Sequence, residues 1–137
     1  MSYPITVMPD PVQLLQQYLK SKSVVTDLVN AANIVTEIPI NPTFPLVVLA
    51  NMGGTGYIAP GIDAVGIQVD VYGGTKFACG VLARTIEAAC WSIANDVVAA
   101  GTLVSSSSEM SPSWLPDQVT VPPTPRYTAR YHFIFRP

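Results

Sequence analysis

Residues 66–86, GIQVDVYGGTKFACGVLARTI, contain the signals that decide the fold. Apolar and polar side chains alternate over residues 64–72, which is the pattern of a strand with one face in the core. The buried face would carry Val65, Ile67, Val69 and Val71, and the polar face Gln68, Asp70 and Tyr72. Two glycines follow, and Thr75 is a good N-cap for a helix that begins after them. The stretch therefore predicts a strand, a tight turn and a helix.

A strand, a glycine turn and a helix N-terminus also form many phosphate-binding sites. A Walker loop needs a glycine, four further residues and then Gly-Lys-Ser/Thr. Here Thr75 precedes Lys76, and no glycine lies at the required position upstream. The dinucleotide fingerprint fails as well, because Gly73 and Gly74 are adjacent and Gly80 comes too late. We therefore predict no nucleotide cofactor and interpret Thr75 as the cap of a packing helix.

The pattern after Thr75 predicts one long helix over residues 75–98, ended by Gly101. Its apolar face would consist of Ala78, Leu82, Ile86, Ala89, Ile93 and Val97. The opposite face would carry Lys76, Gly80, Arg84, Glu87, Trp91 and Asn95. A tryptophan on the exposed side of a helix is either a stray aromatic or a contact, and Trp is enriched in interface cores. We predict that Arg84, Glu87 and Trp91 lie in a subunit interface.

Shorter elements surround this unit. Asp10 and Pro11 favour a helix over residues 11–20, and a second short helix is expected over residues 24–29. Strands are expected over residues 34–38, over 44–52 with both faces covered, over 102–110 as a polar edge, and over 126–136. The chain is predicted to be one α+β domain, residues 1–137. In it, one long and one or two short helices pack on a small, mostly antiparallel or mixed sheet.

Two segments are predicted to be long connections, residues 53–63 and residues 111–125. The first is expected to be a wide hairpin connection or a projecting arm, and the second is an extended loop with five prolines. Loops of this length in compact domains are usually functional or disordered. We predict that their apolar residues dock on partner proteins: Tyr57, Ile58, Trp114 and Leu115.

The last predicted strand carries a row of basic side chains. Alternation over residues 126–136 places Arg126, Arg130, His132 and Arg136 on one face, here called the basic stripe. One interpretation is a solvent-exposed face on which Asp70 pairs with an arginine across the sheet. The other is a channel or partner-facing surface, where DNA would be attracted without sequence readout. No acidic residue follows Asp117 to neutralise the stripe locally.

The composition indicates self-association. Charged residues make up 12% of the 137 residues, about half the usual ~25%. A monomer of this size needs surface charge to stay soluble, so much of the surface is expected to be buried against other subunits. Cys79 and Cys90 fall in the same predicted helix, roughly 16 Å apart, which is too far for a disulfide. We expect two free, buried thiols.

Several functional classes find no support in the sequence. The N-terminus lacks the pattern of a signal peptide, and the most apolar stretch is interrupted by Arg84, Glu87 and Asp96, so no membrane span is expected. His132 has no nucleophile at a fixed spacing, and no carboxylate pair is suitably placed. Two cysteines and one histidine are fewer than the four Cys and His ligands that a structural zinc site usually has. We predict no catalytic residue, no cofactor and no metal, and a protein that is not an enzyme.

The order of segments resembles that of a known family. DPVQLLQQYL comes first, then IVTEIP, FPLVVLANMGG and GIQVDVYG, one long helix, WLPD, a proline-rich loop and PRYTARYHFIFR. Over nearly the whole chain this resembles the tail terminator (tail completion) proteins of long, non-contractile-tailed bacteriophages. The resemblance implies an α+β subunit of a ring, expected to be a hexamer, that caps the tail tube, ends its growth and joins the head.

The implied partners are other copies of the chain, the tail tube protein, a head-completion or connector protein, and DNA that passes through the channel without sequence-specific contacts. The implied location is the head-proximal end of the tail in the virion, after assembly in the host cytoplasm. Two alternatives stay open: a head-side completion or connector ring protein, and a small α+β ligand-binding or regulatory domain.

Overall fold

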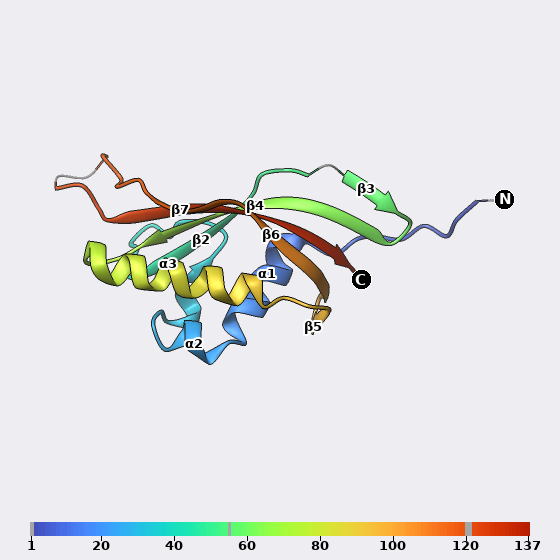
Figure 1. Cartoon of the computed structure of the whole chain (residues 1–137), viewed down its shortest axis with the longest axis horizontal. Helices are drawn as coiled ribbons and strands as arrows, with labels where there is room; N and C mark the ends of the chain where they lie inside the picture. The colour runs from blue at the N-terminus through green and yellow to red at the C-terminus, as the bar shows by residue number, and fades with distance from the viewer. Residues whose placement is uncertain (1, 55, 120–121) are drawn as a thin grey trace.

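The computed structural model describes residues 2–54, 56–119 and 122–137, with the backbone alone at 56 and 57. Within them the chain forms a seven-stranded sheet with all three α-helices on one face (Figure 1). The strand order is β1-β2-β4-β7-β6-β5, with β3 pairing beside β4. β1 and β2 are parallel and every other pair is antiparallel. The predicted α+β class with a mixed sheet is confirmed.

The bounds of the elements follow the chain from the N-terminus to the C-terminus. The helices are α1 Pro11–Lys20, α2 Ser23–Thr26 and α3 Lys76–Trp91, with a short 3₁₀ turn, η1, over Ala31–Asn33. The strands are β1 Ile34–Val35, β2 Leu46–Asn51, β3 Gly56–Ala59, β4 Ile62–Tyr72, β5 Asp96–Val98, β6 Gly101–Trp114 and β7 Arg126–Arg136.

The first helix begins where the sequence predicts. Asp10 Oδ1 accepts a hydrogen bond from the Val12 amide at 3.0 Å, and Pro11 occupies the first turn, where its missing N–H costs nothing. The apolar side of α1 is fully buried against the sheet through Leu14, Leu15 and Leu19. α2 and β1 are shorter than expected, because the chain turns at η1 and again after Val35.

The main core lies between the helices and the central strands β4 and β7. The apolar face of β4 packs there with the aromatic face of β7; Ile67 is opposite Tyr131 and Val69 opposite Ala129. β2 is covered on both faces, as predicted. Val47 and Leu49 face the helices, whereas Leu46 and Val48 join Tyr72 in a small cluster on the other side.

The long helix ends earlier than predicted. Thr75 caps it through a 3.1 Å hydrogen bond from the Ala78 amide, but the helix stops at Trp91 rather than at residue 98. Asn95 takes a left-handed backbone conformation with φ 54°, and the following residues form β5 against β6. Val97, expected on the apolar helix face, is therefore 77% exposed. Gly101 begins β6 and does not end a helix.

Both predicted long loops contain strand. Residues 56–59 form β3, which pairs with β4 in a hairpin, and β4 begins at Ile62 rather than at residue 64. Residues 111–114 continue β6, and the remaining connection is tied by a bridge between Asp117 and Thr124. Residues 105–108 lie in β6, at the polar edge of the sheet, and pair with β7. The expected hairpin is thus present, with a shorter connection than the sequence suggests.

Candidate assembly surfaces

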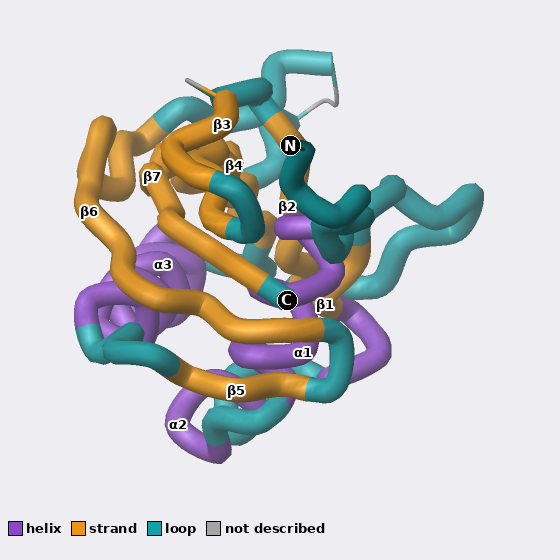
Figure 2. The backbone as a smooth tube through the Cα atoms, turned by 90° about the vertical axis from the view of Figure 1, so that its right-hand side faces the viewer, coloured by secondary structure: helices purple, strands orange, loops and turns teal. Residues whose placement is uncertain are grey.

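The predicted interface on α3 divides into an exposed part and a covered part. Trp91 is 63% exposed at the end of the helix, and its Nε1 donates a 2.9 Å hydrogen bond to Ser108 Oγ. Arg84 is also exposed. Glu87, expected on the same open face, is only 7% exposed, and Ser111 Oγ donates to its Oε1 at 3.5 Å. This part of the expectation is wrong, because β6 runs along that side of α3 (Figure 2).

Truncation of Trp91 is expected to weaken association and leave the fold intact. Loss of a buried interface tryptophan costs ~2 kcal/mol or more, roughly a 30-fold weaker association. Sedimentation of Trp91→Ala against wild type measures the change, and circular dichroism checks the fold. Val97→Ala is the control, since Val97 is similarly exposed but lies on β5. Equal association of Trp91→Ala and wild type would show that Trp91 is an ordinary exposed aromatic.

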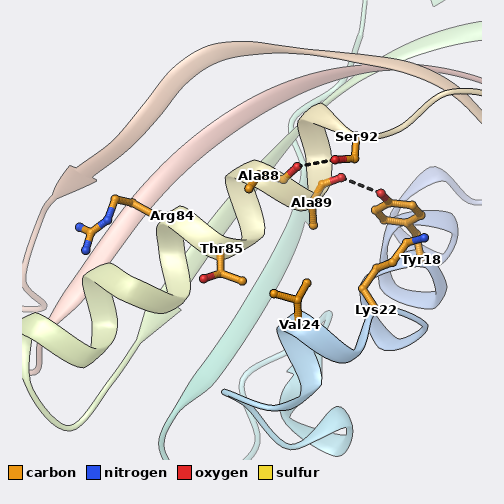
Figure 3. Close-up of a pocket in the computed structure, with 8 residues that line it drawn as sticks. All are labelled: Tyr18, Lys22, Val24, Arg84, Thr85, Ala88, Ala89 and Ser92. Atoms are coloured by element: carbon orange, nitrogen blue, oxygen red, sulfur yellow. Dashed lines mark hydrogen bonds between the residues drawn. The ribbon is translucent and has the colours of Figure 1, made fainter.

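A cleft of about 530 Å³ lies between the α1–α2 region and α3 (Figure 3). Its hydroxyl groups are already engaged. Tyr18 Oη donates to the Ala89 carbonyl at 2.6 Å, Thr85 Oγ1 to Val81 at 2.8 Å, and Ser92 Oγ to Ala88 at 3.0 Å. Lys22 Nζ lies 3.7 Å from Asp96 and 4.8 Å from the centre of the Tyr18 ring. The cleft therefore presents apolar surface with two cations, Lys22 and Arg84, rather than a nucleophile and a base.

The basic stripe occupies the sheet face opposite the helices. Arg130 Nε donates to Gln68 Oε1 at 3.3 Å, across the β4–β7 pair. Asp70 does not pair with an arginine there: its Oδ1 accepts a 2.7 Å hydrogen bond from Thr128, its direct cross-strand neighbour. Arg126 Nε donates to the Leu115 carbonyl at 2.7 Å. Arg126 therefore has a structural role in holding the loop before β7, whereas Arg130, His132 and Arg136 lie nearer the other end of the strand.

The structure adds an acidic residue to the stripe that the sequence reasoning missed. Glu109, on β6, lines a cleft of about 350 Å³ together with Arg130 and His132. Gly54 forms part of its wall, where a Cβ would lie 2.0 Å from the Ala64 carbonyl oxygen. Register alone brings Glu109 beside a strand twenty residues away, since Met110 pairs with Arg130 and Ser107 with His132. No local sequence signal could have found it.

The predicted docking residues differ in how much of each side chain is exposed to solvent. Ile58 is 51% exposed on β3, and Leu115 is 47% exposed. The side chain of Tyr57 lies outside the described residues. Trp114 is 36% exposed, and its ring packs on Tyr127 with centroids 5.3 Å apart. Trp114 thus has a structural contact in its own chain as well as an open edge.

We expect no binding of nucleoside triphosphates at the glycine turn. Lys76 Nζ lies 4.9 Å from the centre of the Trp114 ring, and a Cβ at Gly73 would lie 2.9 Å from Cys79 Cβ. The glycine is therefore needed for close packing, and the lysine is held by an aromatic ring. Calorimetry with ATP or GTP and magnesium should give no binding heat. Micromolar binding abolished by Lys76→Ala would contradict this.

Cys79 and Cys90 are free and buried, as predicted, and Cys79 Sγ donates to the Val71 carbonyl at 3.0 Å. Across the described parts of the chain, no three His, Cys, Asp or Glu side chains gather where they would hold a metal ion. Within those same parts, none of the helices has the length and apolarity to cross a bilayer.

Comparison with known proteins finds a similarity in fold. No family model and no curated protein matches this chain. A chain in the solved structure described as "Virion of native gene transfer agent (GTA) particle" is similar in fold, with a TM-score of 0.63 and 15% sequence identity. The alignment covers 90% of this chain and 92% of that chain. At this identity the comparison shows a shared fold that extends over nearly the full length of both chains.

Proposed function

We propose that this chain is a structural virion protein of a tailed bacteriophage or phage-like particle, a ring subunit that caps the tail tube. The observation that carries the proposal is the fold shared with a chain of a gene transfer agent virion over 90% of this chain. The segment order, which resembles tail terminators, leads to the same role. In this role the ring ends tube growth and forms the joining surface for the head.

The surface composition of the chain supports the proposal that it is a subunit of an assembly. Only 12% of the residues are charged, while large apolar side chains stand exposed on several elements. Ile5 is 97% exposed, Phe77 is 79% exposed and Trp91 is 63% exposed. Low surface charge together with these exposed apolar side chains supports the burial of part of this surface in an assembly. The proposed contacts are with other copies of the chain, the tail tube protein and a head-completion or connector protein.

The open sheet face suits a channel or a partner surface. Arg130, His132 and Arg136 line β7 on the side away from the helices, and Glu109 and Asp70 stand on the neighbouring strands. Such a mixed but mainly basic row attracts phosphate weakly and without sequence preference. We propose that DNA passing through the ring, or acidic groups of a partner, meets this face.

Electron microscopy of particles made without this protein tests the proposal. A tail terminator predicts tubes of excess length that fail to join heads, restored to uniform length when the wild-type chain is supplied. The head-side alternative predicts tails of normal length and heads that lose their DNA. Normal particles would reject both virion roles and favour the ligand-binding alternative, and a compact dimer instead of a pored ring in negative stain would agree with that.

A further inference from the structure

The N-terminal segment, residues 2–7, stands away from the folded body (Figure 1). Its apolar side chains alternate with Ser2, Pro4 and Thr6, and they are almost fully exposed: Tyr3 76%, Ile5 97% and Val7 87%. Pro4 disfavours helical backbone at the residue before it, so an extended conformation is preferred. In an extended segment, the three apolar side chains share one face at a spacing of roughly 7 Å. We call residues 2–7 the arm.

The root of the arm is fixed to the body. Met8 packs against the main core, and Asp10 caps α1. A Cβ built at Gly101 would lie 3.0 Å from Pro9 Cγ and 2.8 Å from the Arg136 carbonyl oxygen, so this glycine lets the root pass close to the end of β7. The arm therefore leaves the body at a defined place, beside the C-terminal end of β7.

An apolar cleft lies at the opposite end of β7. It has a volume of about 270 Å³, below the ~300–1,000 Å³ typical of small-molecule pockets, and so suits a bulky side chain better than a cofactor. Among the residues that the structure describes, no charged side chain lines this cleft. Besides Gly73 and Gly74, its walls are Leu28, Pro45, Phe77, Ala78, Val81 and Leu82. Phe77 at its rim is 79% exposed and Leu28 is 41% exposed.

The arm cannot reach the cleft of its own chain. The Gly73 amide donates to the Pro125 carbonyl, so the cleft adjoins the start of β7, whereas the root adjoins its end. The eleven residues of β7 separate these points by roughly 33 Å. Six extended residues reach ~20 Å at most. Any apolar contact between the arm and such a cleft must therefore join two copies.

We propose that the arm of one copy binds in the apolar cleft of the next copy, with Ile5 as the central contact. Each chain then carries one arm and one cleft at opposite ends, so the contact is head to tail. A heterologous contact of this kind generates a closed ring when the rotation between subunits closes. The closure into a ring rests on the proposed function, but the arm-to-cleft contact does not.

Three single variants test the contact by sedimentation velocity and native mass spectrometry. Ile5→Asp and Phe77→Asp should each weaken assembly at least tenfold, because each places a carboxylate in an apolar contact. Ile40→Asp is the matched control, since Ile40 is the same residue type at the same 97% exposure. Circular dichroism confirms that each variant folds. Unchanged assembly of Ile5→Asp, equal weakening by Ile40→Asp, or a wild type that stays monomeric would overturn the proposal.

Mixing the two variants gives a sharper test. The Ile5→Asp copy retains an intact cleft and the Phe77→Asp copy retains an intact arm, so one productive contact remains. At a protein concentration at which each variant alone is monomeric, a mixture should form a one-to-one heterodimer and no larger species. A mixture that remains monomeric overturns the inference even if particles lacking the protein show overlong tubes. A heterodimer together with normal particles would retain the contact and reject the proposed function.

Discussion

The folded chain is expected to lose stability steeply above about pH 10, where three buried acids resist ionisation. Burial raises the pKa of the Cys90 thiol to about 12, and the nearby Glu87 adds to the shift. Burial, with smaller contributions from Asp96 and Cys90, raises the pKa of Tyr18 to about 12. The pKa of Tyr131 is raised mainly by burial as well, and its Oη has no hydrogen-bond partner among the described residues.

The direction of this pH dependence follows from the number of protons that the folded and the unfolded chain each bind. In the unfolded chain these groups lose protons near their ordinary values, ~8.5 for Cys and ~10 for Tyr, while the folded chain still holds them. Stability is therefore fully present below those values and falls as pH rises toward 12, by up to ~1.4 kcal/mol per pH unit for each group. The three contributions have the same sign and therefore add.

Urea unfolding at pH 7, 9, 10 and 11 measures this slope. Tyr131→Phe should flatten it, and at pH 7 should stabilise the chain by ~1 kcal/mol, because it removes an unpaired buried hydroxyl. Phe133→Leu is the control: Phe133 is fully buried beside Tyr131 but carries no proton, so the whole curve should shift without a change of slope. A free energy of unfolding that stays constant from pH 9 to pH 11 would contradict the prediction.

Reversing the charge of Arg130 and Arg136 together is expected to reduce the output of infectious particles by ~10-fold or more, since two phosphate-attracting groups become repulsive. Both side chains are exposed, so their loss should change the free energy of unfolding by less than ~1 kcal/mol. Arg126 is left unchanged because it holds the Leu115 carbonyl. The change therefore affects the surface of the stripe and spares the loop beside it.

The measurement is particle yield when Arg130→Glu/Arg136→Glu replaces wild type, together with DNA binding by the isolated protein. If the stripe contacts phosphates, the slope of log affinity against log salt should fall by ~2. Lys20→Glu, an exposed reversal at the end of α1, should leave both unchanged. Full particle yield from the double variant would identify the stripe as an ordinary solvent-exposed face.

Elements encoded by short-range signals were predicted well. The Asp10 cap with Pro11, the alternation of β4 and the alternation over residues 126–136 each appear as expected. The free state of Cys79 and Cys90 was also predictable, because their spacing along one helix forbids a bond. The exposed arm also has a signal in the sequence, the apolar alternation at Tyr3, Ile5 and Val7.

The tertiary structure alone decided the end of α3, the hairpin of β3 and the surroundings of the candidate surfaces. Residues 96–98 continue a helical pattern in sequence, but pairing with β6 satisfies their backbone in a strand instead. The sequence pattern places Glu87 on the exposed face of the helix, but β6 covers it. Nothing in the sequence relates Glu109 to β7, but the two strands bring it into the same cleft as Arg130. The periodicity of a segment shows which side of that one element is apolar. Whether a side chain is buried, and which charged groups lie beside it, depends on which other strand packs against the element and in which register.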